Sequence, residues 1–361
     1  MNNFSEINAR IKKAREAMPE NVGGILVTSD INRFYFTDLK YTDSALLITR
    51  DNAYSFADFR HDGLLKDAVG DIYTIIMPEK EGLYGAAAEI CRKEKITCVM
   101  YESMSVSVDE QASIAKNMEG IELVGAGLFF LNLRAVKSEY EISKIKAAQK
   151  LTDEAFAHIL PMLNTKITET EVALELEFFM RNKGASGVSF DYICVSGKES
   201  AKPHGQGRNV PLEKGFFTMD FGCIYDGYMS DMTRTVCIGT PTDEMKRVYD
   251  TVLKAHLAVM ENLKAGMTGK QADTIARDII NNAGYEGLFG HSLGHGVGIE
   301  IHEMPNLSQR NLEPLPIGAV VTDEPGIYIP DKFGVRIENM AAITKDGCID
   351  LSNSPRELIV I

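Results

Sequence analysis

Two aspartates in the segment from Phe216 to Gly239 share one face of a predicted hairpin. Apolar, β-branched runs flank Asp226-Gly227, a dipeptide typical of type I′ turns, which require positive φ at both positions. With that loop, Asp220 lies opposite Thr233, and the alternation of side chains places Asp220 and Asp231 on the same face, roughly 7–8 Å apart at their bases. Two such carboxylates repel each other unless a proton or a cation lies between them. From the hairpin alone, two solvated surface acids explain the pattern equally well.

Histidines gather in a glycine-rich segment between residues 290 and 303, which holds His291, His295 and His302. His295 stands between two glycines, where the missing side chains let a bound ion come close. The i, i+4 spacing of His291 and His295 also matches a zinc pair on a helix, but so many glycines disfavour a helix, and no glutamate lies between the two histidines. The glycines match neither the P-loop nor the dinucleotide fingerprint. We interpret this segment as part of a site rather than as core.

Two glutamates, Glu324 and Glu338, lie in apolar runs on either side of a predicted turn at residues 330–334. An unpaired carboxylate in such a run is costly. An odd number of loop residues would project both glutamates from one face, whereas an even number would place them on opposite faces. The sequence leaves this choice open.

Together these residues form an oxygen-rich set of two aspartates, two glutamates and one histidine. Four carboxylates can neutralise two divalent cations, and a hard, oxygen-rich set with one imidazole favours Mn²⁺ over a Cys/His zinc site. Two metal ions about 3.5–4 Å apart can supply a water-derived nucleophile near neutral pH. The candidate ligands are Asp220, Asp231, His295, Glu324 and Glu338.

The elements that must position these residues fall in the second half of the chain. Capping boxes predict helices that begin after Ser138, Thr168 and Thr268, and a further helix is expected over residues 242–264. The predicted strands lie between and after these helices, which indicates an α+β domain over residues 131–361, with an antiparallel sheet and helices on one side. Residues 1–130 alternate between helix and strand, which predicts an α/β domain with a mixed sheet and no chemistry of its own.

Composition narrows the functional class. Apolar residues make up 45% of the chain and charged residues 25%, as in ordinary globular proteins. The excess of 51 acidic over 38 basic residues argues against nucleic-acid binding. No apolar run is long enough to span a membrane and no secretory signal is present, so we expect a cytoplasmic protein. The six cysteines mostly lie in apolar runs without a Cys-x-x-Cys motif, which predicts reduced core cysteines.

The five candidate ligands and their surroundings resemble one family in particular. Asp231 lies in Ser-Asp-Met-Thr-Arg-Thr, His295 in Gly-His-Gly-Val-Gly, Glu324 in Glu-Pro-Gly-Ile-Tyr and Glu338 in Val-Arg-Ile-Glu-Asn, with Asp220 eleven residues before Asp231. In this order they resemble the metal ligands of the "pita-bread" metallopeptidases, which include aminopeptidase P, prolidase and methionine aminopeptidase. The first half resembles the creatinase-like N-terminal domain of aminopeptidase P and prolidase.

The resemblance implies roles for individual residues. It implies two bound divalent ions, Mn²⁺ first, with Co²⁺ or Zn²⁺ as alternatives, and Glu324 as the general acid/base. It further implies that His204 contacts the substrate and that His302 stabilises the tetrahedral intermediate. The remaining residues implied to line the pocket or brace the ligands are His291, Tyr328 and Arg336.

The resemblance also implies hydrolysis of the Xaa-Pro bond of short peptides by a homodimer. We expect an Xaa-Pro aminopeptidase, with prolidase, an Xaa-Pro dipeptidase, as the alternative. Arg310 could clamp a free carboxylate, as a dipeptidase requires, or could be an ordinary solvated loop residue. An inert binding protein or chaperone on the same fold is disfavoured because all five ligands are intact.

Overall fold

The computed structural model describes residues 3–361, and the chain divides into two compact units between Leu133 and Arg134. The first unit is built on one six-stranded sheet with strand order β4-β3-β2-β1-β5-β6. Its pairings are antiparallel between β1, β2 and β3 and parallel elsewhere, so the sheet is mixed, as the sequence predicts. Its strands are β1 (Gly24–Val27), β2 (Ala45–Thr49), β3 (Ala53–Phe56), β4 (Thr74–Ile76), β5 (Cys98–Tyr101) and β6 (Glu122–Gly125).

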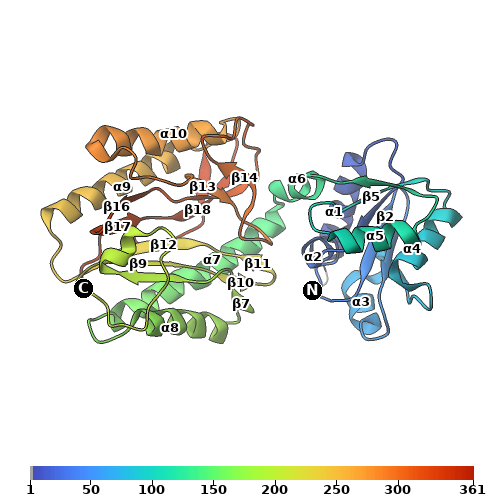
Figure 1. The fold of residues 1–361 in the computed structure, drawn as a ribbon, viewed down its shortest axis with the longest axis horizontal. Coiled ribbons are helices and arrows are strands. Elements are labelled where there is room, and N and C mark those ends of the chain that lie inside the picture. Colours follow the sequence, from blue (N-terminus) through green and yellow to red (C-terminus); the bar gives the residue numbers. More distant parts are fainter. Residues whose placement is uncertain (1–2) are drawn as a thin grey trace. The chain divides into compact units, whose positions relative to one another are not determined.

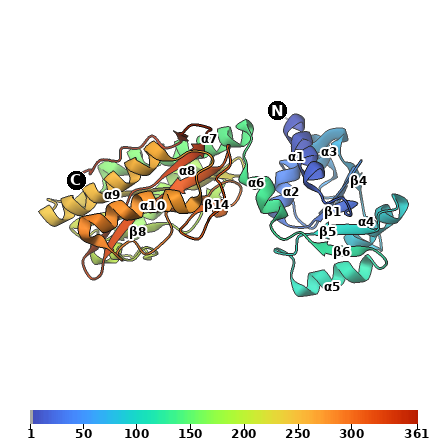
Figure 2. The ribbon, with the colours of Figure 1, turned by 90° about the horizontal axis from the view of Figure 1, so that it is seen from above.

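Helices cover both faces of this sheet. Apolar residues of α4 and α5 pack on one face, and α1 and α2 lie over the other (Figure 2). The helices of this part of the chain are α1 (Phe4–Ala17), α2 (Asp30–Thr37), α3 (Asp62–Val69), α4 (Gly82–Lys93), α5 (Val108–Asn117) and α6 (Phe129–Ala135), with a short helical turn, η1 (Gly70–Ile72).

The second unit combines antiparallel sheets with two pairs of helices (Figure 1). Its helices are α7 (Glu139–Ile159), α8 (Glu169–Asn182), α9 (Asp243–Asn262) and α10 (Gly269–Ile280), with the turns η2 (Leu160–Met162), η3 (Gly197–Ala201) and η4 (Asn281–Tyr285). Its strands are β7 (Gly187–Val188), β8 (Ile193–Ser196), β9 (Gly215–Phe221), β10 (Cys223–Tyr225), β11 (Tyr228–Met229), β12 (Met232–Ile238), β13 (Gly294–Gly296), β14 (Glu303–Leu307), β15 (Val320–Asp323), β16 (Gly326–Ile329), β17 (Phe333–Arg336), β18 (Asn339–Ile343) and β19 (Cys348–Asp350).

The helices of this unit begin where the sequence predicts. All three capping boxes form, at Ser138 with Glu141, Thr168 with Glu171 and Thr268 with Gln271. Apolar faces of α7 and α8 pack against β8, β9 and β12. The corresponding faces of α9 and α10 pack against strands β14, β15, β16, β17 and β18. Each sheet therefore packs mainly against its own pair of helices, although Phe216 and Cys237 at one end of β9 and β12 also join the core of α9 and α10. The rest of the opposite face is left to carry polar side chains.

The predicted Asp-Gly hairpin is present with the expected register. Asp226 and Gly227 both have positive φ (48° and 84°), and Tyr225 pairs with Tyr228. Further along the ribbon, Thr233 pairs with Asp220. The two-residue loop therefore sets the position of both aspartates.

The question left open for the two glutamates is answered by the loop between β16 and β17. Ile329 pairs with Phe333, so the loop has an odd number of residues, 330–332. The neighbouring strands β15 and β18 keep the same register, with Asp323 opposite Asn339. Glu324 and Glu338 therefore project from the same face.

The burial of the cysteines agrees with the expectation that they are core residues. All six cysteines are unpaired and five of them are buried. Among residues 3–361, the structure contains no helix whose length and apolar character would let it cross a membrane.

Candidate metal centre

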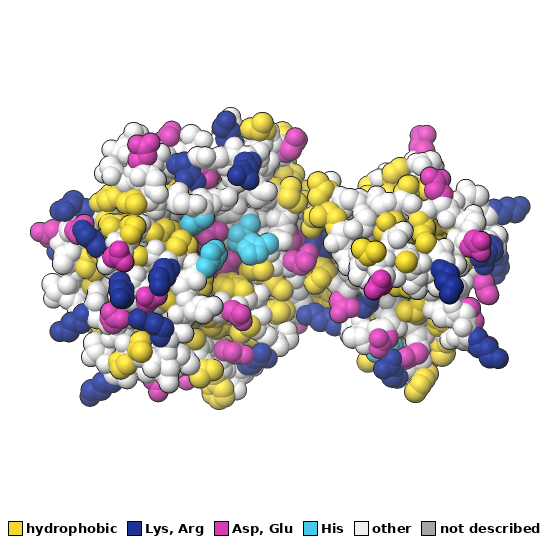
Figure 3. Space-filling view, in the orientation of Figure 1, with side chains coloured by type: hydrophobic (Ala, Val, Ile, Leu, Met, Phe, Trp, Pro, Cys, Tyr) yellow, Lys and Arg dark blue, Asp and Glu magenta, His cyan; other side chains and the backbone are white. Residues whose placement is uncertain are grey.

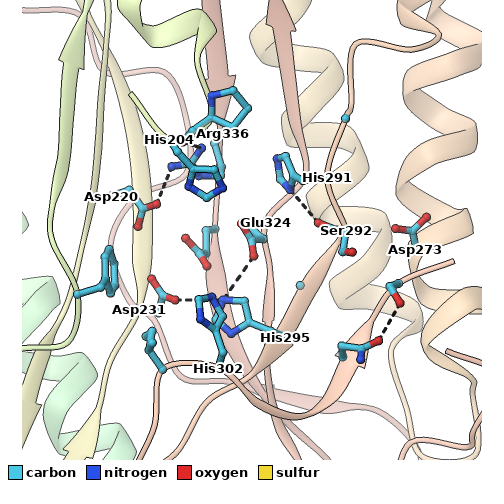
Figure 4. A pocket seen from close by; sticks show the side chains of 18 of the residues that line it. His204, Asp220, Asp231, Asp273, His291, Ser292, His295, His302, Glu324 and Arg336 are labelled. Atoms are coloured by element: carbon cyan, nitrogen blue, oxygen red, sulfur yellow. Dashed lines mark hydrogen bonds and ion pairs between the residues drawn. The ribbon is translucent and has the colours of Figure 1, made fainter. Parts of the chain in front are cut away.

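All of the predicted site residues except Tyr328 line one cavity of about 1090 Å³ in the second unit. Histidine side chains gather beside acidic ones on this face (Figure 3). Figure 4 shows the side chains converging from several strands and loops. The predicted residues among its walls are His204, Asp220, Asp231, His291, His295, His302, Glu324, Arg336 and Glu338, and Arg310 also lines it. Tyr328 is not a wall residue.

Three of the predicted ligands form a tight cluster. One ligand-type atom from each of Asp231, His295 and Glu338 lies within 4.8 Å of the other two. The Nε2 atom of His295 is 3.5 Å from Oδ2 of Asp231 and 3.6 Å from Oε1 of Glu324 (Figure 4). The ligand-type atoms therefore come together from four places in the chain: the β11–β12 connection, β13, the β15–β16 connection and the β17–β18 connection.

Asp220 reaches the same cavity from β9 and pairs with a buried arginine. Nη2 of Arg336 donates a hydrogen bond to Oδ2 of Asp220 at 2.6 Å. The other oxygen, Oδ1, is buried and has no hydrogen-bond partner among the described residues. Buried carboxylate oxygens are normally satisfied, so an orphaned oxygen beside other carboxylates fits the role of a cation ligand.

The acids of the cavity disfavour each other's ionisation. Burial and the negative charges of neighbouring carboxylates raise the pKa of Asp231 and Glu338 well above their ordinary values. Burial, reinforced by Asp220, raises the pKa of Glu324 to about 8 even though Arg336 opposes the shift. Divalent cations would replace the retained protons and remove the repulsion. The donor set of four carboxylates and one imidazole therefore fits divalent metal ions.

His295 has the tautomer that a metal ligand needs. Its Nδ1 lies 3.1 Å from the carbonyl oxygen of Gly296, and because a carbonyl can only accept, Nδ1 carries the hydrogen. Burial and the neighbouring His302 lower the pKa of His295 to about 4, so the ring is neutral at pH 7. The lone pair of Nε2 therefore points at Asp231 and Glu324, as expected for a ligating imidazole.

A hydrogen-bond chain joins Tyr328, which does not line the cavity, to the wall residues Arg336 and His291. Nη1 of Arg336 lies 2.8 Å from Oη of Tyr328, and that hydroxyl lies 2.9 Å from Nε2 of His291. Burial, and then the charge of Arg336, lower the pKa of His291 to about 4, so its ring is neutral at pH 7. Tyr328 thus braces Arg336 and His291.

Two supporting groups were not predicted from the sequence. Oγ1 of Thr233 donates to Oε2 of Glu338 at 2.6 Å and accepts from Nε of Arg336 at 3.0 Å. Since Thr233 follows Asp231 by two residues, strand alternation alone places it on the ligand-bearing face. Arg277 pairs with Asp273 on α10 and also donates to the carbonyl oxygen of His291. No sequence signal links that pair to the site.

Comparison with known proteins agrees with this geometry. The model for metallopeptidase family M24 matches residues 143–345, and the creatinase/prolidase N-terminal domain model matches residues 10–136. An uncharacterized peptidase of Bacillus subtilis is 39% identical, over 98% of this chain and 100% of its own.

Two solved structures resemble the whole chain. The structure of an Xaa-Pro dipeptidase from Bacillus anthracis has a TM-score of 0.94 and 38% identity, covering 98% of this chain and 100% of that chain. That of an X-Pro aminopeptidase from Thermotoga maritima has a TM-score of 0.91 and 34% identity, covering 97% and 100%. Since the M24 match spans more than half of the chain and contains all five predicted ligands, this protein is a metallo-exopeptidase that belongs to metallopeptidase family M24.

Proposed function

We propose that the chain is an Xaa-Pro aminopeptidase, which removes the first residue from short peptides whose second residue is proline. The main support is the cavity, whose volume of about 1090 Å³ lies at the upper end of the ~300–1000 Å³ usual for small-molecule sites and leaves room for a peptide that continues beyond proline. The Thermotoga maritima structure, whose title names an X-Pro aminopeptidase, adds support. A bond to proline has no N–H, so a dedicated enzyme is useful for such peptides.

In this proposal, Asp220, Asp231, His295, Glu324 and Glu338 hold two divalent ions, Mn²⁺ being the best match to the donor set. Bound metal ions supply an activated water near neutral pH. Glu324 takes a proton from the attacking water and passes it to the leaving nitrogen of proline. His302 donates a hydrogen bond to the carbonyl oxygen as negative charge develops on it, and His204 contacts the substrate.

Replacing His302 or His204 by alanine is expected to lower kcat about 100-fold, the loss typical of one transition-state hydrogen bond. Metal content is expected to stay close to that of the wild type. Steady-state kinetics with an Xaa-Pro-Xaa peptide, together with elemental analysis, measure both. His158→Ala is the control, because His158 pairs with Glu175 on α8 and does not line the cavity. Loss of metal from the His302 variant would show that His302 is a ligand instead.

Prolidase activity is the second candidate, and Arg310 favours it. Arg310 lines the cavity, where its guanidinium could bind the free carboxylate of an Xaa-Pro dipeptide. The Bacillus anthracis relative, whose title names an Xaa-Pro dipeptidase, also supports this activity.

Arg310→Gln separates the two activities. If the protein is an aminopeptidase, we expect the wild type to hydrolyse Xaa-Pro-Xaa faster than Xaa-Pro. The variant should then change KM for either substrate by less than about threefold, because a solvent-facing charge contributes little to substrate binding. A dipeptidase would show the reverse substrate order and a KM for Xaa-Pro raised at least about tenfold in the variant, with rescue by Arg310→Lys. Parallel kinetics on the two peptides give the answer.

We also propose a homodimer, which the family resemblance implies. Light scattering of the full chain measures its mass, and a monomer with full activity at nanomolar concentration would rule out a role for assembly.

A further inference from the structure

The segment that carries His204 is held by a carboxylate that is not part of the metal cluster. Glu169, at the start of α8, is completely buried. Its Oε1 accepts hydrogen bonds from the backbone N–H and the hydroxyl of Ser196, both at 2.7 Å, and from Nη2 of Arg208 at 2.7 Å. Its Oε2 accepts from the backbone N–H of Arg208 at 2.8 Å and from Nε of Arg208 at 3.1 Å. One buried carboxylate thus accepts five hydrogen bonds.

These partners stand at the two ends of the His204 segment, residues 197–207. Ser196 ends β8, and Arg208 follows the segment and also reaches back to the carbonyl oxygen of Ser196 at 3.3 Å. Between them, Nη1 of Arg336 donates to the carbonyl oxygen of Pro203 at 3.3 Å. The segment is therefore closed at its base by Glu169 and connected near its tip to the arginine that holds Asp220.

A second helix in the same unit shows that the carboxylate is not needed to start α8. Both α8 and α10 open with a capping box, and in both the capping threonine bridges to a proline, Pro211 for Thr168 and Pro314 for Thr268. The first helical residue of α10, however, is Gly269. The same helix start therefore forms without a side chain at that position, and the carboxylate of Glu169 serves the His204 segment.

We infer that Glu169 is a positioning residue for His204, fixing the segment that presents this histidine to the substrate. This inference rests on the proposed function, which makes His204 a substrate contact. A buried carboxylate is stable only when it is fully hydrogen-bonded, so its preferred state is the closed segment. Bidentate pairing with arginine adds directional strength, and closing the base removes conformational freedom that would otherwise blur the position of His204.

The test is a double-mutant cycle between Glu169→Gln and His204→Ala. Glutamine keeps the size of the side chain but places an NH₂ donor against donors of Ser196 or Arg208, so the base of the segment loosens. We expect Glu169→Gln to lower kcat/KM about 10- to 100-fold, the scale of a misplacement near 1 Å. In the His204→Ala background the same change should have less than about twofold further effect. Metal content should not change, and hydrogen exchange of amides 197–207 should become faster.

Glu171→Gln is the matched control, because Glu171 is an exposed member of the capping box and Gln271 fills the same role in α10. It should leave kcat/KM and the exchange of amides 197–207 unchanged. Equal losses from Glu169→Gln in both backgrounds, or unchanged exchange in the segment, would overturn the positioning role. Absence of Xaa-Pro hydrolysis by the wild type would instead refute the proposed function, and the exchange measurement would still decide whether Glu169 holds the segment.

Discussion

Metal-free protein is expected to have no measurable peptidase activity, and its stability is expected to fall as the pH rises from about 6.5 to about 8. Added Mn²⁺ should reverse both effects. The activity is lost because the activated water comes from bound metal ions. The dependence on pH follows from the acids in the cavity, whose pKa values burial and mutual repulsion raise: Asp231, Glu324 and Glu338.

The direction of this effect is set by proton binding. In the unfolded chain, Glu324 ionises near its ordinary pKa of 4.5, whereas in the folded metal-free protein its pKa is about 8. Between these values the folded state binds more protons than the unfolded state, so the free energy of unfolding decreases as the pH rises. Over these roughly 3.5 pH units, at about 1.4 kcal/mol per unit, Glu324 alone accounts for a loss on the order of 5 kcal/mol. His291 and His295, whose pKa values burial lowers to about 4, oppose this loss below about pH 6.5, so the net fall is expected above that pH. Bound cations replace the protons, so Mn²⁺ should stabilise the protein more at pH 8 than at pH 5.

Urea unfolding at pH 5, 6.5 and 8, with and without Mn²⁺, measures this dependence, and Asp231→Asn provides the matched comparison. In metal-free protein this variant should be more stable than the wild type at pH 8, because it avoids burying an acid whose pKa is raised, and the advantage should shrink toward pH 5. Comparing the two proteins cancels the contributions of the titratable groups outside the cavity. Full activity in a sample shown by elemental analysis to be metal-free would contradict the metal requirement, and a pH-independent difference between the two proteins would contradict the electrostatic account.

The candidate site could be predicted from the sequence through features that are local in the chain. Asp226-Gly227 can form only a narrow range of turns, so the register of a whole ribbon, including Asp220 opposite Thr233, follows from two residues. The capping boxes likewise involve residues three apart, and all three helices begin as predicted.

Features that depend on distant segments could not be predicted in the same way. Whether the loop after Ile329 has an odd or an even number of residues depends on which residues of β16 and β17 pair. That pairing continues the register in which β15 pairs with β18. In the sequence, Glu169 is an acid in the first turn of a helix. Its favourable interaction with the helix dipole is enough to explain an acidic residue at that position. Only the folded chain places Ser196 and Arg208, which lie 27 and 39 positions away, around its carboxylate.

Glu324→Gln is expected to lower kcat by about 100- to 10,000-fold, the range for loss of a general acid/base, with little change in KM. Glutamine has nearly the same shape as glutamate and can still bind through its carbonyl oxygen, but it cannot accept and return a proton. Glu324 suits the proton-carrying role because it is buried at the cavity wall, with Oε1 close to His295 and accepting from Oγ1 of Thr322 at 3.3 Å.

The same substitution also removes one negative charge from the ligand set, so the metal-binding role must be separated from proton transfer. We expect Mn²⁺ to bind the variant more weakly, and a calorimetric titration shows how much metal ion saturates it. At saturation, kcat should remain depressed, because proton transfer is missing even when the ions are in place. Glu313→Gln, which alters an exposed glutamate outside the cavity wall, is the control and should match the wild type in both measurements. If saturating Mn²⁺ restores kcat of the Glu324 variant to the wild-type value, Glu324 is a ligand only, and another group must carry the proton.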